Sequence, residues 1–139
     1  MLQPRKQKFR RLQRGRGNFE GTSKGGSALC HGSFGLKAVT RGEISSRQIE
    51  AARRVISKYT KRGGKVWVTI FPHTPITKKA AEVPMGGGKG SPELYVTLVK
   101  PGRVLFEMDG LDEESAMKAL KLCGYKLSVR CKVINKLKK

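Results

Sequence analysis

A glycine cluster around one lysine is the stretch whose residue types could do chemistry on a phosphate group. The run Met85–Gly90 reads Met-Gly-Gly-Gly-Lys-Gly, and a lysine among glycines is part of a phosphate-binding P-loop. That loop requires Gly-x-x-x-x-Gly-Lys-Ser/Thr after a strand and before a helix. Here Val83 stands at the first glycine position, Gly90 replaces the hydroxyl residue, and a strand is expected next. These departures argue against a nucleotide hydrolase.

Carboxylates that could act as a general acid and base are concentrated in one other segment. Half of the ten acidic residues lie in residues 107–114. Asp112 is placed to cap a helix, however, and Glu113 and Glu114 lie where the positive end of the helix dipole would stabilise them. A capping role accounts for these three carboxylates. We therefore expect no catalytic pair, no small-molecule substrate and no enzyme.

Metal and disulfide chemistry has little support in the sequence. Cys30, Cys123 and Cys131 are odd in number and form no Cys-x-x-Cys pair, unlike a disulfide framework or a zinc ribbon. Cys30 is followed by His31, and the chain has one further histidine, His73. Closed zinc sites normally show ligands paired at short range. We expect no metal, no cofactor, and small buried or half-buried cysteines.

The charge of the chain indicates an anionic partner. Its 139 residues fit one domain, and 30 Lys and Arg against 10 Asp and Glu give a net charge of +20. Such a charge destabilises an isolated compact state, so a polyanion, above all nucleic acid, is expected as partner. A membrane surface is the alternative. It is disfavoured because no apolar run approaches the ~18 residues of a spanning helix and no signal-peptide core follows the basic N-terminus. We expect a cytoplasmic protein.

The N-terminal residues predict a basic arm, which we place at residues 1–22. The arm has too little apolar content to order itself. A solvated tail is one interpretation, but Phe9 and Leu12 among arginines favour a segment that folds onto RNA, with Arg forks for phosphates and stacking. The expected RNA-binding residues of this arm are Arg5, Lys6, Lys8, Arg10, Arg11, Arg14 and Arg16.

A helix with one cationic face is predicted next. Ser45 as N-cap and Gln48 three residues later form a capping box, and Gly63-Gly64 would end the helix. The apolar face comprises Ile49, Ala52, Ile56 and Tyr59, and the opposite face comprises Arg47, Arg54, Lys58 and Lys61. A solvated face is the ordinary interpretation. Because we expect no acidic i,i+4 partners, we favour a face that binds phosphates.

The remaining periodic segments complete an α+β domain. Alternating or β-branched residues predict strands over Phe34–Thr40, Lys65–Phe71, Leu94–Val99, Arg103–Met108 and Leu127–Ile134, with a turn at Arg41–Glu43 and a second helix from Asp112 to Gly124. The middle three strands would form an antiparallel meander. The last strand would present Arg130 and Lys132 to RNA. We expect two helices packed on an antiparallel or mixed sheet.

A long glycine-rich loop separates two of these strands. Residues 72–92 far exceed the 2–5 residues of an ordinary hairpin loop, and loops of that length are usually functional or disordered. Its candidate contact residues are Lys78, Lys79, Met85, Gly86, Gly87, Gly88, Lys89 and Gly90. The expected organisation is therefore an arm (1–22), one domain (23–134) containing this loop, and a basic tail (135–139).

Several strings in order resemble the bacterial large-subunit ribosomal protein of the L-sixteen family. They are Met1-Leu2-Gln3-Pro4, Gly32–Ala38, Arg47–Arg54, Gly64–Val68, Ile70-Phe71-Pro72, Met85–Gly90, Lys100-Pro101-Gly102 and Phe106–Gly110. The resemblance covers the whole chain. It implies a hammerhead-like α+β fold and a structural, non-catalytic role in the large subunit.

The resemblance also implies specific partners. They are large-subunit rRNA of the 23S type, 5S rRNA as a further candidate, neighbouring ribosomal proteins, and tRNA. The loop would reach A-site tRNA, and P-site tRNA as a further candidate, near the peptidyl-transferase region. The ribosome would be cytoplasmic, or organellar if the gene is encoded in an organelle. A free RNA-binding or assembly protein outside the mature ribosome is the alternative.

The loop tip departs from the family pattern at two positions. Where the family usually has Arg before Met-Gly and Lys after the first Gly, this chain has Pro84 and Gly87. The arginine is a hydroxylation target in some members, and Pro84 removes that target. With two cations lost, Lys89 is expected to be the main charge of the tip.

Overall fold

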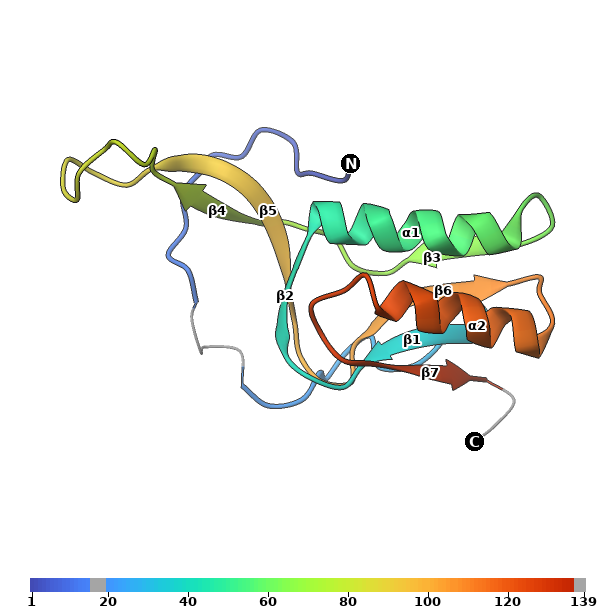
Figure 1. Ribbon diagram of the computed structural model, residues 1–139. Coiled ribbons are helices and arrows are strands. Elements are labelled where there is room, and N and C mark those ends of the chain that lie inside the picture. The colour runs from blue at the N-terminus through green and yellow to red at the C-terminus, as the bar shows by residue number, and fades with distance from the viewer. Residues whose placement is uncertain (16–19, 137–139) are drawn as a thin grey trace.

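Two helices lie side by side over one face of an antiparallel sheet, and a second sheet projects from this body (Figure 1). The computed structural model describes residues 1–15 and 20–136. Arg16 and the end of the basic tail therefore lie outside the described residues. The elements are β1 (Phe34–Ala38), β2 (Gly42–Ser45), α1 (Ser46–Thr60), β3 (Lys65–Val68), β4 (Thr74–Lys78), β5 (Ser91–Val99), β6 (Val104–Asp109), α2 (Glu113–Gly124) and β7 (Cys131–Asn135). The predicted α+β class is confirmed.

The first sheet has the order β3-β6-β1-β7, with antiparallel pairing throughout. Its inner strand β6 is buried from Val104 to Met108. The core forms where Leu36 and Phe106 of this sheet meet Ile56 and Leu120 of the helices. All four side chains are at most 1% exposed. Their burial by both helices fixes one face of the body.

Helix α1 begins as predicted. The Gln48 N–H donates to Ser45 Oγ at 3.3 Å, and the Ser45 N–H donates to Gln48 Oε1 at 3.0 Å, so the capping box is complete. The helix ends at Thr60, before the predicted Gly63-Gly64 stop. Lys61 is its C-cap, with a φ of 49°, so the chain leaves the helix through a left-handed residue other than glycine.

Helix α2 also begins at the predicted cap. Asp112 Oδ2 accepts the Ser115 N–H at 3.2 Å, and Glu113 and Glu114 occupy the first turn. The predicted apolar face of Ala116, Ala119, Leu120 and Cys123 is fully buried. These carboxylates stabilise a helix end, in keeping with the capping role expected for them.

The predicted three-stranded meander is wrong. β3 pairs with β6, but β5 leaves the body and forms a second sheet of order β2-β5-β4. Within it, Ser45 of β2 and Thr74 of β4 both face Val96, from opposite sides of β5. The turn predicted at Arg41–Glu43 is also wrong, because strand β2 of this second sheet begins at Gly42. Alternation identifies a strand but does not name its partner.

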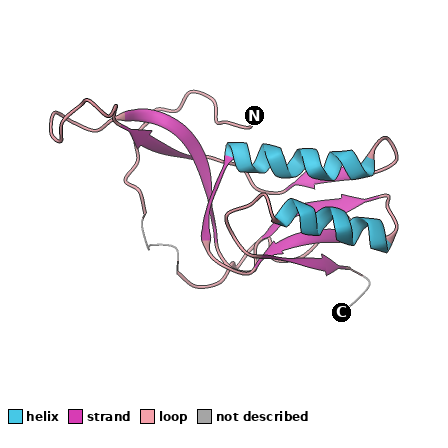
Figure 2. Cartoon of the chain, viewed as in Figure 1, coloured by secondary structure: helices cyan, strands magenta, loops and turns pink. Residues whose placement is uncertain are grey.

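The predicted loop 72–92 is largely a β-hairpin arm. β4 pairs with the first half of β5, from Lys78↔Ser91 to Thr74↔Val96. Residues 72–73 and 79–90 lie outside the ladder, and residues 79–90 form the loop beyond the magenta strands in Figure 2. The predicted strand Leu127–Ile134 is likewise shorter, because β7 starts at Cys131. Val129 instead packs into the core from a non-strand segment.

Candidate nucleic-acid interface

The basic arm lies against the second sheet (Figure 1). Two contacts hold its middle part, at Leu12 and Arg14. Lys89 Nζ donates to the Leu12 main-chain oxygen at 2.5 Å. The Arg14 guanidinium donates to both Glu43 carboxylate oxygens, with Nε–Oε1 and Nη2–Oε2 distances of 3.2 and 2.7 Å. Hydrogen bonding to Glu43 raises the pKa of Arg14. Arg14, predicted to bind RNA, is therefore engaged with β2.

A groove runs between the arm and β5. It encloses about 780 Å³ and is lined by Gln3–Arg11 on one side and by Ser91, Pro92 and Tyr95 on the other. Five predicted RNA-binding residues line it, namely Arg5, Lys6, Lys8, Arg10 and Arg11. The structure thus brings this part of the predicted site together with an aromatic residue that the sequence did not single out.

The cationic face of α1 is exposed, as predicted. Arg47, Arg54, Lys58 and Lys61 all lie on the surface. The expectation that this face lacks acidic i,i+4 partners is wrong at Arg54, whose Nε lies 3.4 Å from Glu50 Oε1. Glu50 bonds more closely to Arg53, at 3.0 Å from Nε. The Arg53 hydrogen bond is the largest cause lowering the pKa of Glu50 to about 2.

The two predicted cations near the C-terminus lie at another edge of the body. Arg130 and Lys132 are exposed, and Lys132 is on β7, an edge strand of the first sheet. Helix α1 packs near β3, the opposite edge. The structure therefore does not unite these cations with the α1 face, and the charge forms separate patches.

The tip of the hairpin exposes main chain at three consecutive glycines. Gly86, Gly87 and Gly88 have φ angles of 103°, 75° and 99°, which favour glycine strongly. A side chain added at any of these three would meet no described atom within 4 Å, and Met85 is 96% exposed. The tip therefore offers a bare backbone beside one apolar side chain.

The lysines around the tip have partners within the chain. Lys79 Nζ donates to the Gly86 oxygen at 2.8 Å, and Lys78 Nζ lies 3.8 Å from Glu93 Oε1. Lys89, predicted to be the main charge of the tip, keeps its positive charge and donates from its ammonium group to a main-chain oxygen of the arm. Gly90 is constrained too, since a Cβ there would lie 2.7 Å from the Lys78 oxygen.

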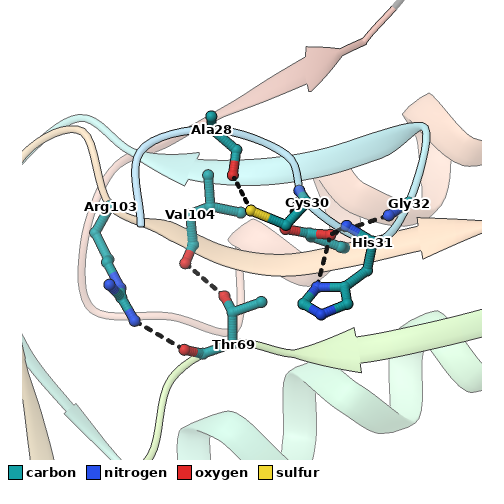
Figure 3. A network of polar contacts seen from close by, with 8 residues as sticks. Ala28, Cys30, His31, Gly32, Thr69, Arg103 and Val104 are labelled. Atoms are coloured by element: carbon teal, nitrogen blue, oxygen red, sulfur yellow. Dashed lines mark hydrogen bonds and ion pairs between the residues drawn. The ribbon is translucent and has the colours of Figure 1, made fainter. Parts of the chain in front are cut away.

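Sequence reasoning missed a buried carboxylate that fixes the loop before β1. Glu107, 1% exposed, accepts the N–H groups of Cys30 at 3.1 Å, His31 at 2.6 Å and Gly32 at 3.0 Å. Figure 3 labels these three donor residues. Burial alone would raise the pKa of Glu107, but these hydrogen bonds and the nearby His31 ring lower it below its ordinary value. A lone acid in the apolar run Val-Leu-Phe-Glu-Met was the available signal.

Arg103 also holds the segment before β1 in place. Its Nη2 donates to the Thr69 oxygen at 2.9 Å and its Nη1 to the Gly25 oxygen at 3.3 Å, with Thr69 and Arg103 drawn in Figure 3. The His31 ring also stacks on Trp67, with centroids 5.8 Å apart. These contacts hold the segment before β1 against the sheet, so Glu107 and Arg103 have structural roles.

The described residues contain no group of three or more His, Cys, Asp or Glu side chains that could hold a metal ion. Cys123 is buried and Cys131 is half-buried, as expected, but the expectation is wrong for Cys30, which is exposed. In the same part of the chain, no helix has the length and apolar character needed to cross a membrane.

Comparison with known proteins identifies the family of the chain. A family model described as ribosomal protein L16p/L10e matches residues 4–134. The chain belongs to the L16p/L10e ribosomal protein family. The resemblance in the sequence motifs is thus confirmed, and as an L16p/L10e protein the chain is a structural component rather than an enzyme.

Curated relatives match along almost their whole length, and each is called "Large ribosomal subunit protein uL16". The protein of Leptospira biflexa is 54% identical over 136 residues, covering 98% of both chains. That of Heliobacterium modesticaldum is 52% identical, covering 98% of this chain and 93% of its own. That of Nitrobacter hamburgensis is 50% identical over 137 residues, covering 99% and 98%.

Proposed function

We propose that the chain is a structural protein of the large ribosomal subunit that binds its rRNA and presents the hairpin tip to tRNA. The observation that carries this proposal is the separation of two kinds of surface. Cations cover the arm, α1 and β7, whereas the projecting tip offers Met85 and three left-handed glycines. Phosphate contacts position a protein on RNA, and a bare backbone allows close approach to a second molecule.

In this proposal, the cations of each patch bind large-subunit rRNA. They are Arg5, Lys6, Lys8, Arg10, Arg11, Arg14 and Arg16 of the arm, Arg47, Arg54, Lys58 and Lys61 of α1, and Arg130 and Lys132. The rRNA is of the 23S type, with 5S rRNA as a further candidate. The domain of residues 23–134 would be the rRNA-binding body between the arm and the short tail.

The tip, from Met85 to Gly90, would lie beside A-site tRNA, with P-site tRNA as a further candidate. The tRNA contact would use main-chain groups and Met85 of the tip. Lys78, Lys79 and Lys89, which keep their positive charge beside their partners in the chain, would add attraction for the phosphates. Changing Lys78, Lys79 and Lys89 together to Ala should impair tRNA binding more than subunit assembly. Filter binding of tRNA and gradient profiles of subunits would measure the two effects, and equal losses would contradict this division.

Residue-level mapping of protein–RNA crosslinks on intact ribosomes tests the proposal as a whole. The arm should crosslink to rRNA and the tip to tRNA. The chain should also stay on large subunits through a high-salt wash, in a bacterial cytoplasm or an organelle. The competing proposal, a free RNA-binding or assembly protein, predicts that the chain is recovered mainly in ribosome-free fractions.

A further inference from the structure

The groove between the arm and β5 combines features that phosphate binding alone does not require. One wall is the arm, and the other is Ser91, Pro92 and Tyr95. Tyr95 is half-buried on β5 opposite Pro75 of β4, so the pairing of β5 with β4 positions its backbone. We propose that this groove binds an unpaired stretch of RNA and stacks one of its bases on Tyr95. This rests on the proposed function, whose rRNA partner it specifies as single-stranded at this site.

The arm wall is held in place before any RNA arrives. Just beyond the groove, the Leu12 carbonyl accepts the Lys89 amine and the Arg14 guanidinium forks onto Glu43. We call these two contacts the clasp. A second, smaller cavity of about 310 Å³ lies beside the clasp and is lined by Leu12, Arg14, Lys89 and residues 75–77 of β4. Because the clasp already orders the arm, RNA binding needs to order less of the chain.

The charge of the groove selects a polyanion. Arg5, Lys6, Lys8, Arg10 and Arg11 line it, and none of its described lining residues is acidic. A volume of about 780 Å³ lies within the roughly 300–1,000 Å³ of ordinary ligand pockets. It is large enough for a base and its phosphates. Phosphates would meet the arm cations while a base enters the groove.

The aromatic ring selects unpaired RNA over duplex RNA. In a duplex the bases stack on one another and offer only backbone and groove edges, whereas an unpaired base can stack on Tyr or on a guanidinium plane. Phe9, 68% exposed on the same arm, already carries Lys8 Nζ 5.5 Å from its ring centroid. Tyr95 is therefore the ring that we assign to the base.

The decisive comparison uses the full chain with Tyr95→Leu and, as its matched control, Tyr95→Phe. Binding to a 12-nucleotide uridine-rich RNA is followed by fluorescence anisotropy, beside a duplex RNA of the same length. Tyr95→Leu should weaken single-strand binding roughly 5- to 150-fold, the range expected for one base–aromatic stack. Tyr95→Phe should bind normally. The salt dependence should not change, because stacking releases no counterions. Equal single-strand affinity of both variants overturns the inference.

A second measurement keeps the inference testable if Tyr95→Leu fails to fold. The wild-type chain is irradiated with the same RNA carrying 5-bromouridine, and the crosslinked peptide is identified by mass spectrometry. A crosslink at Tyr95 supports the inference if an excess of unlabelled single-stranded RNA abolishes it and an excess of duplex RNA does not. Crosslinks confined to the lysines would overturn the inference, because they would show that the groove binds RNA through charge alone. Displacement of the RNA by polyglutamate as efficiently as by unlabelled RNA would have the same meaning.

High-salt-washed large subunits separate this inference from the proposed function. If the chain stays on the subunit but Tyr95 gives no RNA crosslink there or with the oligonucleotide, the inference fails and the proposed function stands. If the chain washes off while Tyr95 still crosslinks to the oligonucleotide, the groove stands and the ribosomal assignment fails.

Discussion

Lys89 Nζ donates a hydrogen bond to the main-chain oxygen of Leu12, 2.5 Å away and 77 positions earlier in the chain. The bond joins the hairpin tip to the N-terminal arm. Glu43, at the base of the second sheet, holds the same arm through Arg14 at 2.7 Å. The arm and the hairpin therefore form one surface, although neither segment contains a signal for the other.

Removing the Lys89 amine should loosen the arm. One hydrogen bond contributes about 0.5–1.5 kcal/mol. Because proteolysis follows the population in which the arm is detached, Lys89→Ala should be cleaved by trypsin after Arg10, Arg11 and Arg14 roughly two- to tenfold faster than the wild-type chain. Lys78→Ala is the matched control, because Lys78 pairs with Glu93 on the hairpin itself. Equal cleavage rates in both variants would disprove the clasp.

Truncating Glu107 should destabilise the whole fold. Glu107→Ala leaves the buried N–H of Gly32 and those of Cys30 and His31 without their acceptor, at an expected cost of about 3 kcal/mol. Glu114→Ala, which removes an exposed carboxylate paired with Lys118, should change stability by less than about 1 kcal/mol. Urea unfolding monitored by the fluorescence of Trp67 measures both variants. Similar unfolding midpoints would contradict the buried role of Glu107.

The same carboxylate should make stability depend on pH. Its folded pKa lies below the ordinary value, so the folded state binds the proton less readily than the unfolded state. The stabilisation is therefore present above the unfolded pKa of about 4.3 and is lost as pH falls through the folded pKa. Urea titrations between pH 3 and 7 should show a steeper acid loss in the wild-type chain than in Glu107→Gln. Parallel curves would refute this linkage.

Arm cations should control the salt dependence of RNA binding. Changing Arg5, Arg10 and Arg11 to Ala removes three groove cations, and each lost phosphate contact should flatten the log–log slope by about 0.7–0.9. The control replaces Lys118, Lys121 and Lys126 with Ala, an equal change of charge on and beside α2. Affinity measured from 50 to 300 mM salt gives both slopes. An unchanged slope in the arm variant would exclude these residues from phosphate contact.

The three thiols should differ in reactivity. Burial, with a smaller contribution from Cys131, raises the pKa of Cys123 to about 12, and burial raises that of Cys131 to about 11. Since the thiolate is the nucleophile, iodoacetamide at pH 8 should modify exposed Cys30 first and Cys123 last. Peptide mass spectrometry follows the order, and denaturant should equalise it. Rapid native labelling of Cys123 would mean that the α2 core opens.

Local signals in the sequence predicted the helices and the chemical class of the partner. The capping box of Ser45 and Gln48 and the cap at Asp112 act within four residues, so both helix starts could be read directly. Helical periodicity placed the buried face of α2 correctly. The charge of +20 is a sum over residue types and needs no fold. Specific family strings added the ribosomal assignment.

Only the tertiary structure decided which distant segments meet. β5 could have completed the meander with β3 and β6, but it pairs with β2 and β4, which turns the expected loop into a hairpin. Lys89 could have pointed to solvent, and it binds Leu12 instead. Glu107 satisfies three N–H groups about 75 residues away in sequence. Strand pairing and buried hydrogen bonds depend on the packing of the whole chain, and a local pattern carries no record of that packing.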